Sequence, residues 1–290
     1  MSEQTPQISL IIVSWNVREI LKENLARLFA LPSAASFEVL VIDNGSEDGS
    51  SKMVRQEFPQ VHLMQNDYNS GFAHACNQGL SMAQGEVLVL FNPDMLMGEG
   101  VLQHTYETLA RQKDIGVMGV KLLHPDGTLV KSVRRDPGFK DQLAVLLKVP
   151  HLVPKVVDSY LANDFDYTLS QNVEQIRGSY FAFRRDVMEK IGMLDQTFFV
   201  WFEEVDFCRR ARQAGYRIWY SADVACTDLV GRAFKQISTR SKQYHLNNSM
   251  RKYFHKWHPR WQALAIGSLL PLVLLLGLGH DLWRKSRSNS

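Results

Sequence analysis

The stretch Glu86-Val87-Leu88-Val89-Leu90-Phe91-Asn92-Pro93-Asp94 decides how this chain folds. After its first residue the run to Phe91 is apolar, which is typical of a strand buried on both faces of a parallel sheet. Asn92 and Pro93 are turn residues and fit a plain strand stop. Asp94 would also lie at the carboxyl end of the strand, where open α/β sheets bind ligands. A carboxylate there suits Mg²⁺ or Mn²⁺ beside a diphosphate, because these cations prefer oxygen ligands.

Similar runs occur on both sides of this strand. The expected strands are apolar and rich in β-branched residues, and they cover residues 8–13, 37–42, 61–65 and 86–91. The expected helices have amphipathic spacing and cover residues 15–31, 50–58 and 71–84. This alternation predicts an α/β fold with a mostly parallel, doubly wound sheet through about residue 120.

The second half of the chain is less regular. Further strands are expected at residues 116–123, 176–184 and 216–220, and further helices at 185–191 and 203–214. Residues 134–171 are broken by three prolines and predict an insertion of mixed helix and loop.

Composition limits the class of protein. The 290 residues are 45% hydrophobic, which allows one large α/β domain or two small ones with a sizeable core. The net charge of +3 is too small to indicate a nucleic-acid partner. Cys76, Cys208 and Cys226 lack the spacing of a zinc site or a disulfide framework, which indicates a reducing compartment. Residues 1–7 carry no apolar signal region, so we expect the main domain to stay in the cytosol.

Two unusual stretches lie near the C-terminus. Residues 232–260 contain eight Lys or Arg, no acid and several aromatic residues. Such a stretch suits a membrane surface, an anionic substrate or a solvated helix face. Residues 261–280 carry no formal charge, and their length is at the lower limit for a bilayer span. We expect a C-terminal hydrophobic helix that associates with a membrane as a short span or an in-plane hairpin; the alternative is a helix buried against the main domain or a partner.

Polar side chains follow the first two expected strands. Ser14 and Asn16 follow the first, where they can contact a ligand or simply cap the next helix, and Trp15 between them can stack on a base. Asp43 ends the second strand, where an acid can accept hydrogen bonds from a base or a ribose hydroxyl. The chain has neither a G-x-G-x-x-G nor a G-x-x-x-x-G-K-[ST] motif, which argues against a Rossmann dehydrogenase and a P-loop.

Two further groups of residues suit chemistry on a charged ligand. Asn69 to Gly79 form a loop that runs into a helix, and Gly71 permits close backbone approach where the helix dipole favours an anion; a plain cap is the alternative. Glu203, Glu204 and Asp206 follow a cluster of aromatic residues. Acids are favoured at any helix start. A carboxylate in apolar surroundings, however, has a raised pKa, which suits a general base.

In their order along the chain, these motifs resemble the inverting family-2 glycosyltransferases of the GT-A fold, and within them the bacterial rhamnosyltransferase-type enzymes of cell-surface polysaccharide assembly. The resemblance covers residues 8–258, and its motifs lie at residues 11–16, 41–50, 69–79, 92–94, 177–181 and 198–216. It implies a GT-A domain over residues 1–258, with a nucleotide-binding N-terminal half and an acceptor-binding C-terminal half. Residues 259–290 would form a hydrophobic, membrane-associated tail.

The resemblance also implies roles for the matching positions. Donor-binding roles fall to Ser14, Asn16 and Asp43 at the nucleoside, Asn69 and Gly71 at the ribose and diphosphate, Asn92 in the DxD-like motif, and Gly178 and Ser179 at the donor sugar and acceptor. Asp94 would bind Mg²⁺ or Mn²⁺, which neutralises charge on the leaving diphosphate. Glu204 aligns with the catalytic carboxylate that takes a proton from the acceptor hydroxyl; Glu203 is the fallback.

The chain departs from the family pattern at two positions. Asn92 takes the first acidic place of the DxD-like motif, and Asp228 stands where many relatives have a His. Asp228 is also a competent metal ligand; His245 is a less favoured substitute and is expected to be an exposed helix residue. These departures keep open a catalytically degenerate sugar-nucleotide binder or a scaffold protein of a glycan-assembly complex. A sugar-phosphate nucleotidyltransferase is the other alternative, although no Gly-rich, Arg- or Lys-bearing loop follows the first strand.

The resemblance thus implies an enzyme at the cytoplasmic face of a membrane. It would move a sugar, with rhamnose as one candidate, from a dTDP- or UDP-sugar to a polyprenyl-linked glycan acceptor, and it would bind no nucleic acid. Asp43 suits uracil and thymine equally, so the base stays open.

Overall fold

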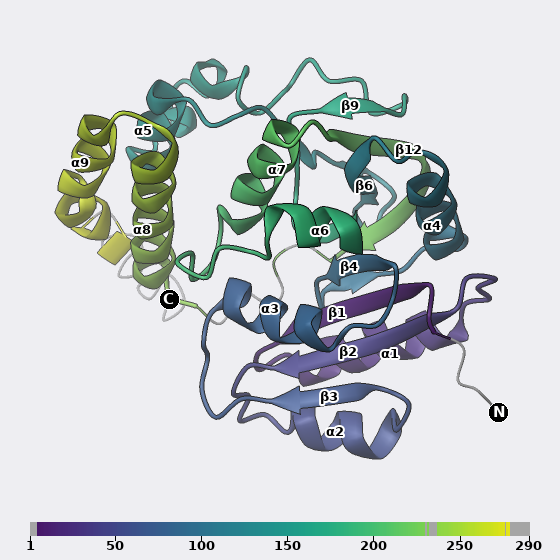
Figure 1. The fold of residues 1–290 in the computed structure, drawn as a ribbon. Coiled ribbons are helices and arrows are strands. Elements are labelled where there is room, and N and C mark those ends of the chain that lie inside the picture. Colours follow the sequence, from purple (N-terminus) through teal and green to yellow (C-terminus); the bar gives the residue numbers. More distant parts are fainter. Residues whose placement is uncertain (1–4, 230, 232–236, 276, 279–290) are drawn as a thin grey trace.

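The computed structural model describes residues 5–229, 231, 237–275 and 277–278, and it shows a central sheet with helices on both faces (Figure 1). The first four strands are β1 (Ile8–Ser14), β2 (Phe37–Asp43), β3 (His62–Gln65) and β4 (Val87–Phe91). The helices between them are α1 (Arg18–Ala30), α2 (Ser50–Glu57) and α3 (Phe72–Met82). The alternation expected for this half of the chain is confirmed, with ends that differ by at most three residues.

The second half adds further strands, three further helices on the sheet and a separate group of helices. Its strands are β5 (Met95–Leu96), β6 (Ile115–Leu123), β7 (Leu129–Val130), β8 (Val133–Arg134), β9 (Gln171–Val173), β10 (Gln175–Ile176), β11 (Tyr180–Arg184) and β12 (Arg217–Asp228). Its helices are α4 (Val101–Arg111), α5 (Phe139–Leu146), the 3-10 helices η1 (Val149–His151) and η2 (Pro154–Val157), α6 (Arg185–Ile191), α7 (Glu203–Gln213), α8 (Thr239–Trp257) and α9 (Arg260–Ser268).

The main sheet has the strand order β3-β2-β1-β4-β11-β6-β12-β5. Strands β1 to β4 pair in parallel, and so do β6 and β12. Strand β11 runs antiparallel to both β4 and β6. The mostly parallel sheet is therefore confirmed, with one reversed strand near its middle. Because Ser14 is in register with Asp43, the carboxyl ends of β1 and β2 lie side by side.

Apolar side chains cover both faces of this sheet. On one face Leu25, Met53 and Leu109 bring α1, α2 and α4 against the strands. On the other face α3, α6 and α7 are packed through residues such as Leu80 and Phe207. Burial on two faces explains why the strands read as continuous apolar runs, and it makes the sheet doubly wound as expected.

Strand β12 is much longer than the sequence predicts, because it reaches Asp228 instead of ending at Tyr220. Its pairing with β6 shifts register between Ser221 and Ala225. A register shift of this kind moves side chains to the other face of a sheet and breaks the alternation from which a strand is recognised. The extension matters because it carries Asp228 to the end of β5.

The C-terminal hydrophobic helix expected within residues 259–290 is not supported. Helix α9 ends at Ser268 and packs against α8, with Ala263 and Ile266 buried. Pro271 lacks the amide hydrogen that would bond to the Gly267 carbonyl, and the chain is helical again over residues 270–275. Within the residues that the structure describes, no helix has the length and apolar character needed to cross a membrane. Residues 279–290 of the expected tail lie outside the described residues.

Candidate active site

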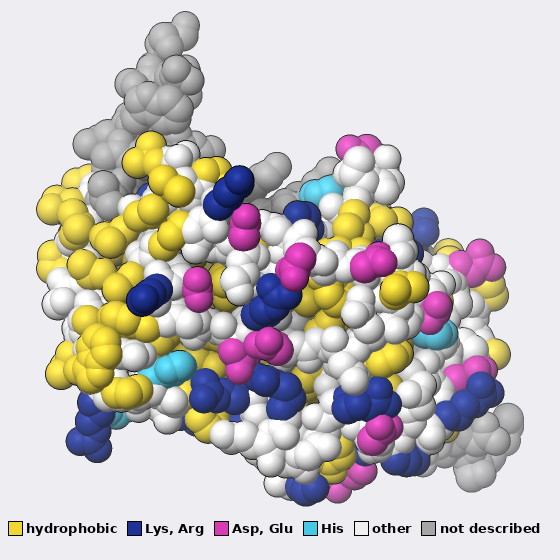
Figure 2. All heavy atoms as spheres, turned by 90° about the horizontal axis from the view of Figure 1, so that it is seen from above, with side chains coloured by type: hydrophobic (Ala, Val, Ile, Leu, Met, Phe, Trp, Pro, Cys, Tyr) yellow, Lys and Arg dark blue, Asp and Glu magenta, His cyan; other side chains and the backbone are white. Residues whose placement is uncertain are grey.

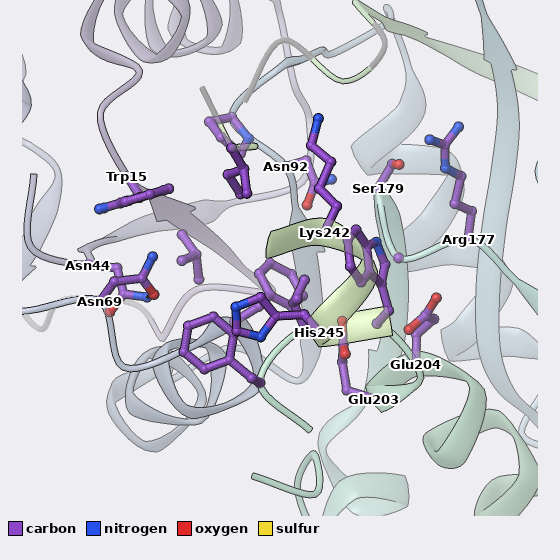
Figure 3. Close-up of a pocket in the computed structure, with 18 of the residues that line it drawn as sticks. Trp15, Asn44, Asn69, Asn92, Arg177, Ser179, Glu203, Glu204, Lys242 and His245 are labelled. Carbon is purple, nitrogen blue, oxygen red and sulfur yellow. Dashed lines mark hydrogen bonds between the residues drawn. The ribbon is translucent and has the colours of Figure 1, made fainter. Parts of the chain in front are cut away.

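A cavity of about 450 Å³ lies beside the carboxyl ends of β1, β2 and β4 (Figure 3). Trp15, Asn44 and Asn69 lie together at one end of it, and Arg177 and Glu204 lie at the other. Its walls come from segments far apart in the sequence: residues 13–15, 44, 69–72, 92–93, 177–179, 199–204 and 237–245. The fold therefore builds one elongated site with a polar, aromatic end and an acidic end.

Asn44 organises the polar end of the cavity. Its backbone N–H donates to the Ser14 carbonyl over 2.7 Å, which ties β2 to β1. Its side-chain amide donates to Asn69 Oδ1 over 3.0 Å, and its Oδ1 accepts the Ser70 N–H over 3.0 Å. Asn44 lies within the motif at residues 41–50, but no role is predicted for it, because an Asn after a strand is typical of an ordinary turn.

The residues expected at the nucleoside make contacts within the protein. Asp43 is buried, and its carboxylate accepts the Ser46 N–H over 2.9 Å and the Ser51 hydroxyl. Asn16 Oδ1 accepts the Glu47 N–H over 2.8 Å. These bonds shape the loop that follows β2. Trp15 lines the cavity, whereas Ser14, Asn16 and Asp43 are not among its lining residues.

Gly71 is required by a neighbouring segment of this chain. Its φ is +93°, and a Cβ there would lie 2.8 Å from the Phe199 carbonyl oxygen and from the Phe199 ring. The Phe72 N–H at the start of α3 donates to the same carbonyl over 2.6 Å. The close approach expected at Gly71 is thus a contact with Phe199. Asn69, two residues earlier, lines the cavity.

Asp94 and Asp228, the two expected metal ligands, come together on paired strands. Met95 of β5 is in antiparallel register with Asp228, and the Leu229 N–H donates to the Asp94 carbonyl over 2.9 Å. Both side chains are buried. Asp228 Oδ2 also lies 3.3 Å from Arg177 Nη1, so the pair reaches the acidic end of the cavity through Arg177.

This pair suits one kind of metal site. No group of three or more metal-binding side chains is found within the described ranges. Mg²⁺ and similar cations, however, are commonly held by one or two carboxylates together with substrate phosphates and water. Asp94 and Asp228 therefore fit a cation that arrives with a diphosphate, and they do not fit a preformed cage made by protein alone. Asn92 lies beside them on the cavity wall, with its N–H donating to Ser179 O over 3.0 Å.

Glu203 and Glu204 open α7 and both line the cavity. The two residues before them, Trp201 and Phe202, have positive φ values of 64° and 72°. Backbone in this region costs non-glycine residues free energy and persists where the surrounding structure enforces it. The strained turn directs two consecutive carboxylates inward, and within the described chain the Oε2 atom of each has no hydrogen-bond partner.

Burial raises the pKa of both carboxyl groups. Glu203 is affected most, because burial and then the charge of Glu204 raise its pKa well above 4.5. Burial also raises the pKa of Glu204, but the Arg177 guanidinium opposes that shift. Two adjacent carboxyls in an apolar site do not both ionise readily. Arg177 favours the charged form of Glu204, so the surroundings favour a proton on Glu203 over a proton on Glu204.

Two neighbours position this acidic pair. Gly178 packs beside Glu204, since a Cβ there would lie 3.7 Å from Glu204 Cβ and Cγ. Asp206 is fully buried and faces away from the cavity, with Oδ2 accepting Arg210 Nε–H and Oδ1 accepting Trp257 Nε1–H, each over 2.8 Å. Asp206 thereby fixes α7 to α8. Ser179 lines the cavity between Gly178 and β11.

Helix α8 supplies a wall that the sequence did not place. Lys242 and His245 line the cavity, and the His245 ring stacks on Phe199 with centroids 4.4 Å apart. The expectation that His245 is exposed is wrong, because it is half-buried and burial lowers its pKa. The basic, aromatic composition of residues 232–260 is the sequence feature that could have predicted this wall, because contact with an anionic substrate is one interpretation of it.

The comparisons with known proteins identify the family. The family model described as glycosyl transferase family 2 matches residues 9–192. The chain belongs to glycosyltransferase family 2. The family decides against the sugar-phosphate nucleotidyltransferase alternative, and the chain is a glycosyltransferase.

Curated relatives of this glycosyltransferase act in glycan biosynthesis. The N-acetylglucosaminyl-diphospho-decaprenol L-rhamnosyltransferase of Mycobacterium tuberculosis is 25% identical over 234 residues, which cover 76% of each chain. The low-salt glycan biosynthesis hexosyltransferase Agl10 of Haloferax volcanii is 24% identical over 217 residues, which cover 73% of this chain and 63% of that one.

Solved structures share the fold. The mannosyltransferase PcManGT from Pyrobaculum calidifontis, solved with GDP-Man and Mn²⁺, has a TM-score of 0.59 and 19% identity, covering 99% of this chain and 77% of that one. GalNAc-T7, solved with UDP, GalNAc and Mn²⁺, has a TM-score of 0.57 and 13% identity, covering 77% of this chain and 43% of that one. These similarities establish the GT-A fold for this glycosyltransferase.

Proposed function

We propose that this glycosyltransferase moves a sugar from a dTDP- or UDP-sugar to a polyprenyl-linked glycan acceptor in cell-surface glycan biosynthesis, with inversion at the anomeric carbon. Rhamnose is the first sugar to test, because the Mycobacterium tuberculosis relative is named as a rhamnosyltransferase that acts on a decaprenol-linked substrate. We place the reaction at the cytoplasmic face of a membrane, where such an acceptor lies. The observation that carries the proposal is the cavity with an aromatic, amide-lined end and a buried carboxylate pair at the other.

The donor fits the long axis of the cavity. Trp15 offers a ring for the base, and the Asn44 and Asn69 amides offer polar contacts at the same end (Figure 3). The diphosphate would then lie near Asn92, with the sugar directed toward Gly178 and Ser179. Asp94 and Asp228 would hold Mg²⁺ or Mn²⁺, and such a cation neutralises charge on the leaving diphosphate.

Glu204 is the general base in this proposal. Its carboxylate takes the proton of an acceptor hydroxyl as that oxygen bonds to the anomeric carbon, and the bond to the diphosphate oxygen breaks on the opposite side. Arg177 keeps Glu204 ionised, while Glu203 is protonated and accepts no proton. Lys242, on the cavity wall, adds a positive charge for a diphosphate-bearing substrate.

The test is nucleoside diphosphate release by the purified full-length chain. A panel of dTDP-, UDP- and GDP-sugars is supplied with Mg²⁺ or Mn²⁺ and extracted lipid acceptors. We expect acceptor-dependent release with one donor, and a fall of about 10²- to 10⁴-fold in Glu204→Gln with donor binding retained, because general base catalysis contributes about that much. Metal-dependent donor binding without any release by the unchanged chain would overturn the proposal and favour the degenerate sugar-nucleotide binder.

A further inference from the structure

Exposed apolar side chains are concentrated on one side of the molecule. Nine of the fifteen large hydrophobic side chains that are exposed in the described part of the chain come from two short segments. They are Leu147, Leu152, Val153, Val156, Trp261, Leu264, Leu272, Leu275 and Leu278. Figure 2 shows hydrophobic side chains gathered at the left edge of the molecule, the side on which α5 and α9 lie in Figure 1. We call these nine side chains the apolar face.

Helix α5 joins the two segments. Its C-terminal end leads into η1 and η2, which pack against it. Leu152 and Val153 lie between these two 3-10 helices, and Val156 lies in η2. Its first residue, Phe139, packs on Trp261 of α9 with ring centroids 4.9 Å apart. The insertion and the C-terminal helix are therefore neighbours in space, although more than a hundred residues separate them in the sequence.

The charges within the two segments of the apolar face have one sign, although Asp141 and Asp158 flank the first segment. Residues 142–157 contain no acid, and neither do residues 259–278. Lys155, His151 and Arg260 are exposed within or beside these segments. Exposed Leu and Trp side chains with basic neighbours are typical of surfaces that lie in the interface of a bilayer with anionic lipids. A second copy of this chain would bring like charges together, so charge complementarity favours the lipid surface.

We propose that the apolar face binds the surface of an anionic bilayer, with its two segments inserted side by side and neither of them spanning it. This differs from an anchor made by the C-terminal tail alone, because the insertion supplies four of the nine side chains. Leu152 and Leu264 are the most exposed of these side chains, at 87% and 73%, and would enter the interface most deeply.

The arrangement brings the cavity to the membrane. Helix α8 lines the cavity through Lys242 and His245 and packs against α9 along its length. This part of the inference rests on the proposed function, because a polyprenyl-linked acceptor presents its diphosphate at the bilayer surface. The apolar face would then hold the open cavity within reach of that diphosphate.

Flotation of the full chain with vesicles tests the inference without donor or acceptor. Vesicles of phosphatidylcholine with phosphatidylglycerol are compared with vesicles of phosphatidylcholine alone. We expect binding that is stronger with the anionic lipid and that falls at least about tenfold in Leu152→Asp/Val153→Asp and again in Leu264→Asp, since each apolar side chain lost from the interface removes a tenfold factor or more. Leu169→Asp is the matched control, because Leu169 is 59% exposed outside the apolar face.

Each other outcome counts against the inference. Failure of the unchanged chain to float with vesicles would overturn it. Normal flotation of Leu152→Asp/Val153→Asp would also overturn it, because the C-terminal segment alone would then account for membrane binding. Light scattering without vesicles adds a further check: a dimer that both variants dissociate, without vesicle binding, would make the apolar face an interface between copies. Transfer activity on detergent-dispersed acceptor is measured separately, so failure of the proposed function is distinguishable from failure of vesicle binding.

Discussion

Arg177 connects the two chemical groups of the site. Its guanidinium lies 3.3 Å from Asp228 Oδ2 and also lowers the pKa of Glu204 against the effect of burial. Arg177 belongs to the motif at residues 177–181, yet a single Arg before a strand does not predict this double contact. Its place between the acid pair and the expected metal ligands is a product of the fold.

We predict that Arg177→Gln moves the acid limb of the pH–activity profile to higher pH. A general base works only when ionised, so activity falls as the pH drops through its pKa. Loss of the guanidinium raises the pKa of Glu204 further, and the fall then begins at a higher pH. The profile of kcat/KM against pH checks this, with Arg177→Lys expected to restore most of the original limb. An acid limb that stays in place would show that Arg177 does not set the charge of Glu204.

A second prediction concerns the effect of Glu203 on the pH dependence of stability. Its folded pKa is raised above 4.5, so the folded state keeps a proton that the unfolded chain loses. The free energy of unfolding that this proton contributes is complete below about pH 4.5. It declines as the pH rises toward the folded pKa, by up to about 1.4 kcal/mol per pH unit for one proton. Glu203→Gln removes this decline, and we expect the variant to be the more stable protein near neutral pH.

Urea unfolding at a series of pH values between about 5 and 8 measures this difference. Glu99→Gln is the control, because Glu99 is exposed and its replacement should leave the slope unchanged. Parallel stability curves for Glu203→Gln and the unchanged chain would contradict a buried, protonated Glu203.

At the scale of elements, the sequence predicts best where each strand is buried on both faces. The run from Val87 to Phe91 and the strands β1 and β2 have no other interpretation once helices separate them. Prediction from the sequence fails where burial is uneven. Strand β12 changes register after Ser221, and α9 contains both buried Ile266 and exposed Leu264. Hydrophobic content alone does not tell a helix packed on one side from a helix surrounded by lipid.

Helix α3 provides a prediction at this scale. Gly71→Ala places a Cβ 2.8 Å from the Phe199 carbonyl at a φ of +93°, so the variant meets both a clash and a backbone cost. Gly100→Ala is the matched control, because Gly100 precedes α4 with a φ of +71° and has nothing within 4 Å. We expect Gly100→Ala to lose about 1–2 kcal/mol of unfolding free energy and Gly71→Ala to lose clearly more, as measured by urea unfolding. Equal losses would show that the Phe199 segment moves aside without cost.

At the scale of the whole molecule, the site depends on helices that sit beyond the sheet. The family pattern predicts residues at strand ends, such as Asn92, because strand ends meet at one edge, and it predicts Glu204 at the start of α7. It does not place Lys242 and His245 on the cavity wall, and both reach the cavity because α8 packs on α7 through Asp206 and Trp257. Such contacts between distant segments have no periodicity along the chain, so no local pattern predicts them.

The same dependence makes the C-terminal segment part of the fold. Ala263, Ile266 and Val273 are buried in a cluster with Leu146 of α5 and Phe254 of α8. The Ile266 carbonyl accepts the side-chain amide of Asn247, also buried, over 2.9 Å. Removal of residues 261–290 would therefore expose this cluster and leave the Asn247 amide without its acceptor.

We predict that a chain ending at residue 260 melts at least about 5 °C below the full chain, because burial worth several kcal/mol is lost. Leu264→Asp removes an exposed side chain from the same helix and should melt within about 1 °C of the full chain. Thermal unfolding followed by circular dichroism compares the three proteins. If the shortened chain melts normally, α9 is an independent appendage, and its loss of membrane binding would report an anchor alone. If the shortened chain melts at the lower temperature, its loss from the membrane fraction reports unfolding as well as lost membrane binding. The surface variants then separate these two effects.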